Sequence, residues 1–494
     1  MELRDARPGP STSRQRLDSI QMMRGVAALL VVVTHAVDLA EAHPHLGVSR
    51  IAGLGHLGNF GAIGVDLFFV ISGFVMALSV ANAAGAPAAG RFLVLRWARV
   101  APPFLIACAV LICLHAFVGP PPALPWRAAA NAVVFVPVLD RWGYTLPVLD
   151  VGWTLSFEFT FYLGVAAMVL LGLSRRLWLL AAGMTALVGL GAVLRPGTFL
   201  LAWVSNPIVL EFALGIVAYL VWERGLLTRV RPLWWTLGGA AAAVLAAQVV
   251  VGYHDVSEAR TVLDGSTSAL RVLLWGVPLF FLFLALLPLG QDGRDSRLGR
   301  AARSLGDSSY SLYLVHIPVF VVLGAVLTRS PALPVADLVV VVAVVLAVAA
   351  GTVFHHWVEA PINDYVRRVS TRHPAPARTA APRETTTSAT RAPATRAPEA
   401  VRGPEPAAHT ERAVLSGRHG DRRPPVPRLV PPVPPSRPRG VAGTGGRQGA
   451  RHPLHPHADH RRPAAPGRLA SAADQRSAAD AARDVQPTGV GGPR

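Results

Sequence analysis

Ten segments of this chain are apolar over about 20 residues, the length a helix needs to cross the hydrocarbon core of a bilayer. They cover residues 20–40, 60–80, 100–119, 153–171, 176–194, 204–222, 233–252, 269–289, 309–329 and 335–358. The chain is 52% hydrophobic and only 15% charged, whereas an average globular protein is about one quarter charged. We therefore predict an all-α integral membrane protein with about ten transmembrane helices, the first of them an uncleaved span.

The placement of arginine predicts the orientation of these helices. The chain contains no lysine, and 26 of its 47 arginines precede residue 371. With the N-terminus in the cytoplasm, 19 of the 26 fall on the cytoplasmic side, which favours ten spans with both termini inside. An eleventh apolar stretch, from Ala128 to Leu139, is about 12 residues long and suits an interfacial or re-entrant segment better than a span. Counting it as a span would also destroy the arginine asymmetry.

Composition divides the chain into three regions. We predict a cytoplasmic segment over 1–16, a ten-span membrane domain over 17–370 and a disordered cytoplasmic tail over 371–494, since the tail is rich in Pro and Arg and contains no aromatic residue. The tail holds most of the net charge of +18. It is a solvated linker, a segment that touches anionic lipid headgroups, or an out-of-frame extension of a GC-rich gene. Because it lacks aromatic stacking residues, we do not expect nucleic acid as a partner.

Ionisable residues inside the apolar segments are candidates for function, because burying them in a bilayer is costly. Arg24 and His35 lie eleven residues apart on one face of the first segment, which places His35 ~16 Å deeper along a helix. There the imidazole can act as a general base; the alternative is a histidine that only packs against a neighbouring helix.

Three further groups of polar residues stand out. Asp66 in the second segment could orient an imidazole, pair with an arginine, or simply mark the start of the helix. Arg96 and Arg99 share a helix face before the third segment and suit phosphate groups, although arginines at such a border also serve as ordinary membrane anchors. Glu158 and Tyr162 share a face at i, i+4.

The ninth segment carries Ser309, Tyr313 and His316 on one face. Together with Glu158 and Tyr162 they could form a pocket that recognises hydroxyl groups; the alternative is interhelical hydrogen bonding. His355, His356 and Glu359 could ligate a metal ion, but an anchoring role is favoured and we predict no metal site.

These segments together resemble, in order along residues 17–368, the acyltransferase-3 family of integral membrane acyltransferases. Six motifs carry the resemblance. They are Arg24 with His35, the run Gly64–Phe74, Arg96 with Arg99, the run Trp153–Tyr162 with Thr154 where the family usually has serine, the run Ser309–His316, and Glu359 with Pro361.

The resemblance implies transfer of an acyl group, by default acetyl, from acyl-CoA to a hydroxyl of a carbohydrate, glycolipid or glycosylated metabolite. It implies a multi-pass protein of the cell membrane, surrounded by lipid, in which His35 is catalytic and Arg96 and Arg99 hold the CoA phosphates. We add Glu158 as a second catalytic candidate and Arg24 as a further donor-binding candidate. Asp66, Ser72, Tyr162, Tyr313 and His316 are the candidates for binding the acceptor. The tail lacks the pattern of the SGNH domain that is fused to some relatives.

One alternative comes from a different class of protein. Ten spans with buried His, Asp and Glu could form a transporter that relays protons. Transporters often contain inverted repeats with broken helices in paired positions, and the sequence shows no such repeat.

Overall fold

The computed structural model describes residues 10–54, 56–118, 126–135, 139–140, 143–144, 146–194, 197–253, 256–289, 297–332 and 334–372. Within these residues the protein is helical apart from one minimal antiparallel hairpin, in which Leu139 pairs with Tyr144 and Asp140 with Gly143. This confirms the predicted fold class. The predicted tail from 371 lies, except for its first two residues, outside the described residues, as do residues 1–9 of the predicted N-terminal segment.

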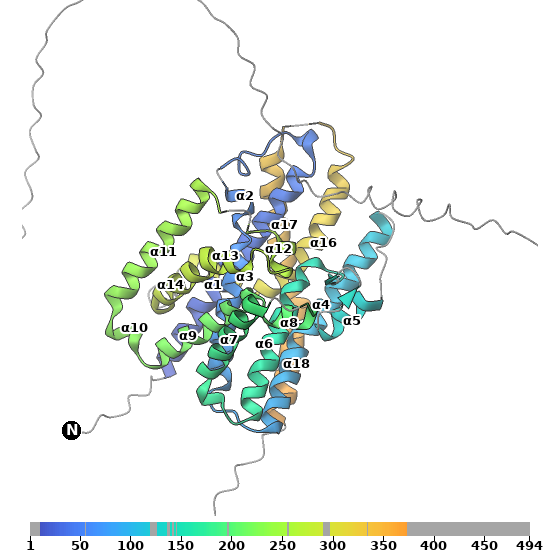
Figure 1. The fold of residues 1–494 in the computed structure, drawn as a ribbon. Helices are drawn as coiled ribbons and strands as arrows, with labels where there is room; N and C mark the ends of the chain where they lie inside the picture. Colours follow the sequence, from blue (N-terminus) through green and yellow to red (C-terminus); the bar gives the residue numbers. More distant parts are fainter. Residues whose placement is uncertain are drawn as a thin grey trace, which may run out of the picture. The chain divides into compact units, whose positions relative to one another are not determined.

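The elements follow one another as α1 (Pro10–Glu41), η1 (Pro44–Leu46), α2 (Leu57–Phe60), α3 (Ile63–Val80), α4 (Ala86–Val118), α5 (Trp126–Val134), β1 (Leu139–Asp140), β2 (Gly143–Tyr144), η2 (Asp150–Gly152), α6 (Trp153–Leu170), η3 (Ser174–Arg176), α7 (Trp178–Leu194), α8 (Phe199–Val204), η4 (Pro207–Val209), α9 (Leu210–Glu223), α10 (Leu226–Arg229), α11 (Arg231–Val251), α12 (Ala259–Leu263), α13 (Ser268–Arg271), η5 (Val272–Gly276), α14 (Val277–Leu286), η6 (Leu287–Leu289), α15 (Arg297–Asp307), α16 (Ser309–Leu327), α17 (Ala336–Phe354), η7 (His355–Glu359) and α18 (Ala360–Arg372). Figure 1 shows α11 beside α14, and α16 beside α17.

Nine helical segments of the described residues are long and apolar enough to cross a membrane, and they correspond to nine of the ten segments predicted from the sequence. The remaining one, predicted over 176–194, is the 17-residue apolar helix α7. At 1.5 Å per residue α7 is ~25 Å long, which is at the lower limit for a span. In the described part of the stretch rejected as a span, residues 128–134 belong to the nine-residue helix α5 and Leu139 belongs to β1.

Two predicted segments differ from the observed helices at their boundaries. The third was expected to begin at residue 100, but α4 begins at Ala86 and runs for 33 residues through Pro102 and Pro103. Arg96 and Arg99, predicted to share a helix face before the third segment, therefore lie within the same continuous helix as that segment. At the other end of the chain, α17 continues through the π turn η7 into α18.

Close helix contacts in the bundle depend on glycine. A Cβ atom at Gly215 of α9 would lie 2.2 Å from the Val70 carbonyl oxygen and 2.7 Å from the Cα of Gly73 in α3. Similarly, a Cβ at Gly306 of α15 would lie 2.0 Å from the carbonyl oxygen of Gln21 in α1. Small residues at such crossings let backbones approach closely, which is how helices associate in lipid.

The same contacts fix the relative direction of the helices. Since Gly25 of α1 meets Gly306 just before α16 begins, and His35 of α1 stacks on His316 of α16, α1 and α16 run in the same direction. The first turns of α16 are thus level with Arg24. This end of the bundle contains the candidate site described below.

We expect Gly215→Ala to lower the melting temperature of the detergent-purified protein, because the new methyl group overpacks the α3–α9 crossing at a cost of about 1–3 kcal/mol. The matched control is Gly183→Ala in α7, where an added Cβ has no atom within 4 Å. An unchanged melting temperature for Gly215→Ala would show that α3 and α9 are not packed as described.

Candidate functional site

A cavity of about 150 Å³ lies among α1, α3, α4, α6, α16 and η7. Its wall is mainly apolar on the α3 side, and charged and hydroxyl side chains converge on it from the other helices. Its charged and hydroxyl-bearing lining residues are Arg24, Ser72, Arg96, Arg99, Thr154, Glu158, Tyr162, Tyr310, Tyr313 and Glu359. Residues from six separate elements thus form one site, which only the folded bundle brings together.

Three guanidinium groups face this cavity. Arg96 and Arg99 come from one face of α4, and Arg24 comes from α1. Arg96 lies over the Phe92 ring at 5.6 Å from its centroid, and Arg24 donates a 3.1 Å hydrogen bond to Gln21. In the part of the chain that the structure describes, none of the three forms a salt bridge with a carboxylate. Their donors remain available for an anionic ligand.

Glu158 of α6 is held by two hydroxyl groups. Ser72 Oγ donates to its Oε1 at 2.9 Å, and Tyr162 OH donates to the same oxygen at 2.5 Å. The predicted i, i+4 neighbours Glu158 and Tyr162 are therefore in direct contact. The hydroxyls satisfy Oε1 of this carboxylate, and among the described residues Glu158 forms no salt bridge with an arginine.

Two tyrosines of α16 line the cavity and are hydrogen-bonded to backbone carbonyls. Tyr313 OH donates to the Val151 carbonyl oxygen at 2.7 Å and lies 3.0 Å from Thr154 Oγ1. Tyr310 OH donates to the Val100 carbonyl oxygen at 2.8 Å. These bonds fix both rings as walls of the cavity.

The second carboxylate at the cavity is Glu359, in the π turn η7 that follows α17. Its Oε2 accepts hydrogen bonds from Ser311 Oγ at 2.6 Å and from His355 Nδ1 at 3.0 Å. Single π turns inside helices occur frequently at functional sites. Here the turn places Glu359 within electrostatic range of Arg24, although the two do not form a salt bridge.

His35 does not line the cavity. Its ring stacks on the ring of His316 with centroids 5.3 Å apart, and its Nδ1 lies 3.2 Å from Asp38 Oδ2. About 36% of the His35 side chain is exposed, whereas His316 is fully buried. Since Arg24 and His35 belong to one continuous helix, eleven residues separate them by ~16 Å along its axis. Tyr313 lies between, lining the cavity and with its ring centroid 6.0 Å from that of His316.

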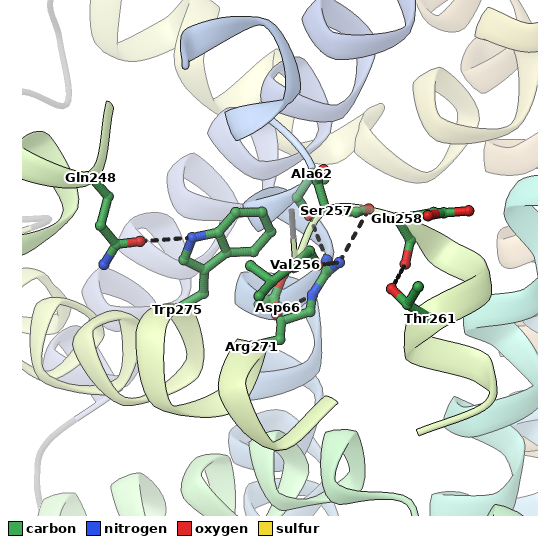
Figure 2. Close-up of polar contacts among 9 residues, drawn as sticks. All are labelled: Ala62, Asp66, Gln248, Val256, Ser257, Glu258, Thr261, Arg271 and Trp275. Atoms are coloured by element: carbon green, nitrogen blue, oxygen red, sulfur yellow. Dashed lines mark hydrogen bonds and ion pairs between the residues drawn. The ribbon is translucent and has the colours of Figure 1, made fainter. Parts of the chain in front are cut away.

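Asp66 also lies outside the cavity lining, in a buried ion pair. Figure 2 shows the Arg271 guanidinium beside Asp66 and backbone carbonyls. Arg271 Nε and Nη2 donate to the two carboxylate oxygens at 2.8 Å and 2.7 Å, and both side chains are at most 1% exposed. Arg271 also donates to the carbonyl oxygens of Ala62 and Val256. Pairing with an arginine was one of the roles expected for Asp66. This geometry favours an architectural role over the predicted substrate-binding role, since breaking such a pair costs about 3–5 kcal/mol.

The structure thus brings together seven of the ten predicted site residues: Arg24, Ser72, Arg96, Arg99, Glu158, Tyr162 and Tyr313. It places His35 and His316 as a stacked pair farther along α1 and α16, and Asp66 at the ion pair with Arg271. Sequence reasoning missed Thr154 and Tyr310 as cavity residues. It considered Glu359 as a motif residue, an anchor or a metal ligand, but not as a cavity residue. Tyr310 precedes Tyr313 by three residues, so the helical period could have identified it.

The arrangement fits a ligand with an anionic end and an apolar or amphipathic body. Three positive side chains outnumber the two glutamates, and guanidinium groups bind phosphate oxygens through paired donors. The apolar lining from α3 can accept an uncharged chain. The exposed imidazole of His35, at the far side of Tyr313, can exchange a proton with a second substrate.

Comparison with known proteins assigns the family. Residues 17–354 match the acyltransferase-3 family, described as "Acyltransferase domain". The chain is 31% identical over 266 residues to the exopolysaccharide production protein ExoZ of Rhizobium meliloti (strain 1021), covering 53% of this chain and 77% of that protein. It is 28% identical over 360 residues to the acyltransferase MdmB of Streptomyces mycarofaciens, covering 63% and 89%. No solved structure matches the chain.

The family match spans more than half of the chain and includes all the helices that form the cavity except the final turn at Glu359. The protein is therefore a multi-pass membrane acyltransferase that belongs to the acyltransferase-3 family.

Proposed function

We propose that this protein is an O-acyltransferase of the cell membrane that moves an acyl group, by default acetyl, from acyl-CoA to a hydroxyl of a carbohydrate, glycolipid or glycosylated metabolite. The observation that carries the proposal is the convergence of Arg24, Arg96 and Arg99 on one cavity without a carboxylate partner in the described residues. Three guanidinium groups beside an apolar wall match the phosphates and the uncharged arm of acyl-CoA.

The side on which the cavity lies supports this donor. Its arginines lie in the N-terminal halves of α1 and α4, and Tyr310 and Tyr313 lie in the first two turns of α16. The positive-inside rule assigns the N-terminal ends of these helices to the cytoplasm. Acyl-CoA is a cytoplasmic metabolite, so it would enter directly. Phosphates held at Arg24 leave the thioester to extend ~16 Å along α1 before it reaches His35.

In the proposed reaction, His35 takes the proton of the acceptor hydroxyl as the oxygen attacks the thioester carbonyl. The new C–O bond forms, the C–S bond breaks, and the CoA thiolate leaves. Alternatively, His35 first accepts the acyl group on its ring nitrogen and then passes it to the acceptor. Glu158, with Ser72 and Tyr162, keeps the donor end of the cavity polar without cancelling the arginines.

The relatives are consistent with an acceptor that bears hydroxyl groups. ExoZ is named for exopolysaccharide production and MdmB as an acyltransferase. We extend this to the present chain as the proposal that its acceptor is a hydroxylated carbohydrate or a glycosylated molecule.

The proposed role of Arg96 and Arg99 in binding the donor phosphates can be tested by comparing acetyl-CoA with a donor that lacks them. We expect Arg96→Gln and Arg99→Gln each to raise the KM for acetyl-CoA by ~10-fold or more, since a hydrogen bond to a charged group contributes about 1.5–3 kcal/mol. With acetylpantetheine, which lacks the phosphates, the variants should match the parent protein. Arg224→Gln, at an exposed arginine outside the cavity, is the charge-matched control. Equal KM values for acetyl-CoA in all variants would contradict the donor site.

The proposed role of His35 as the general base can be tested with membrane vesicles and acetyl-CoA labelled in the acetyl group. We expect His35→Gln to reduce label transfer by 10²–10⁴-fold, the usual contribution of a general base, without changing the KM for acetyl-CoA. His115→Gln is the control, because within the described residues His115 is hydrogen-bonded to the carbonyl oxygen of Leu111 in its own helix and to no other group.

Full label transfer by the His35 variant and by an Arg96/Arg99 double variant would refute the assignment. Movement of a polar substrate across the vesicle membrane without consumption of acetyl-CoA would instead identify a transporter.

A further inference from the structure

The exposed end of the His35 imidazole is held by a carboxylate that the sequence motifs do not include. Asp38 follows His35 by one helical turn on α1, and its Oδ2 lies 3.2 Å from His35 Nδ1. The Asp38 side chain is 48% exposed. Among the described residues, this is the hydrogen bond that the His35 ring makes.

We propose that Asp38 is a positioning residue for His35, a role that rests on the proposed function of His35 as the base. An ionised carboxylate can only accept a hydrogen bond. The proton of a neutral His35 must therefore lie on Nδ1, where it is donated to Asp38. The lone pair is then on Nε2, which becomes the nitrogen that takes the proton of the acceptor hydroxyl.

The ring plane is fixed by a second contact. His316 is fully buried, lies with its Nδ1 3.2 Å from its own helix carbonyl at Leu312, and stacks on His35 at an interplanar angle of 23°. Asp38 thus determines the tautomer and His316 the plane of the same imidazole. Other tautomers and ring orientations cannot accept the proton of the acceptor hydroxyl. A base held in one tautomer and one orientation therefore reacts faster than one that samples them all.

The position of Asp38 also defines the side from which the acceptor approaches. Asp38 is one turn farther than His35 from the arginine cavity on α1, and both side chains are more than one third exposed. Asp150, at the start of η2, is exposed and interacts electrostatically with His35, but it makes no hydrogen bond to the ring in the described part of the chain. The two carboxylates thus lie near His35, and Asp38 occupies its Nδ1 side, which leaves Nε2 for the acceptor hydroxyl.

The test compares Asp38→Asn, Asp38→Glu and Glu41→Gln in native membrane vesicles, with labelled acetyl-CoA as donor and the vesicle glycolipids and polysaccharide as acceptors. An asparagine at 38 can donate to Nδ1 and so favour the wrong tautomer. We expect Asp38→Asn to lower kcat by roughly 10- to 100-fold, less than the loss of the base itself, with an unchanged KM for acetyl-CoA. Asp38→Glu should recover part of the rate because it restores the carboxylate.

Glu41→Gln is the matched control, since Glu41 is an exposed acid one turn further along α1 and should have no effect. The melting temperature of Asp38→Asn should equal that of the parent protein, which separates positioning from stability. Asp38→Asn with kcat within twofold of the parent would overturn the inference. If His35→Gln is also fully active, the proposed function itself fails; if His35→Gln is inactive, only the role of Asp38 fails.

A second pair of variants tests the stacking contact. His316→Phe retains an aromatic ring against His35 and should retain most of the rate, whereas His316→Ala removes the ring and should lower kcat. If His316→Phe loses as much kcat as His316→Ala while remaining folded, the ring nitrogens of His316 are needed and its role as a stacking support is wrong.

Discussion

Hydrocarbon offers no hydrogen-bond partners, so a polar group inside a transmembrane bundle must be satisfied by the protein or by a ligand. The ion pair between Asp66 and Arg271 meets this demand within the protein, with both carboxylate oxygens and backbone carbonyls engaged. It joins α3 to α13 at the π turn η5. Charged groups that are paired and hydrogen-bonded within the protein in this way have a structural role.

The cavity differs from this ion pair, because its carboxylates and arginines are not paired with one another. Glu158 and Glu359 are satisfied by hydroxyls and a histidine, although arginines lie within electrostatic range of both. Had these glutamates been placed to neutralise the arginines, the cavity would have been a second architectural cluster. The three guanidinium groups instead line the cavity and form no salt bridge within the described residues, which supports the proposal of an anionic donor.

How far the sequence predicts this site can be explained residue by residue. Arg24, Arg96, Arg99, Glu158, Tyr162, Ser72 and Tyr313 were identified because charged and hydroxyl groups are conspicuous in apolar segments. Their convergence could be expected only through the family resemblance, since spacing along one helix says nothing about a neighbour. The same limit explains Asp66: its partner Arg271 is 205 residues away, and no local pattern connects them. The length of α4 was missed because the span was placed by its apolar residues, whereas the helix begins at Ala86 and continues through Pro102 and Pro103.

A single rigid element, α1, carries both Arg24 of the cavity and His35 of the stacked pair. Because an α-helix has a fixed rise, the axial separation of Arg24 and His35 is determined by eleven residues of helix and not by a flexible loop. α16 repeats this arrangement in parallel, with Tyr310 and Tyr313 at the cavity and His316 beside His35. In the proposed reaction, the two parallel helices thus fix the distance between the arginine cavity and His35, and a thioester arm of matching length reaches the base. Specificity for the donor's carrier group would then follow from the backbone of α1 and α16, while the nature of the acyl group would depend on the side chains around Tyr313.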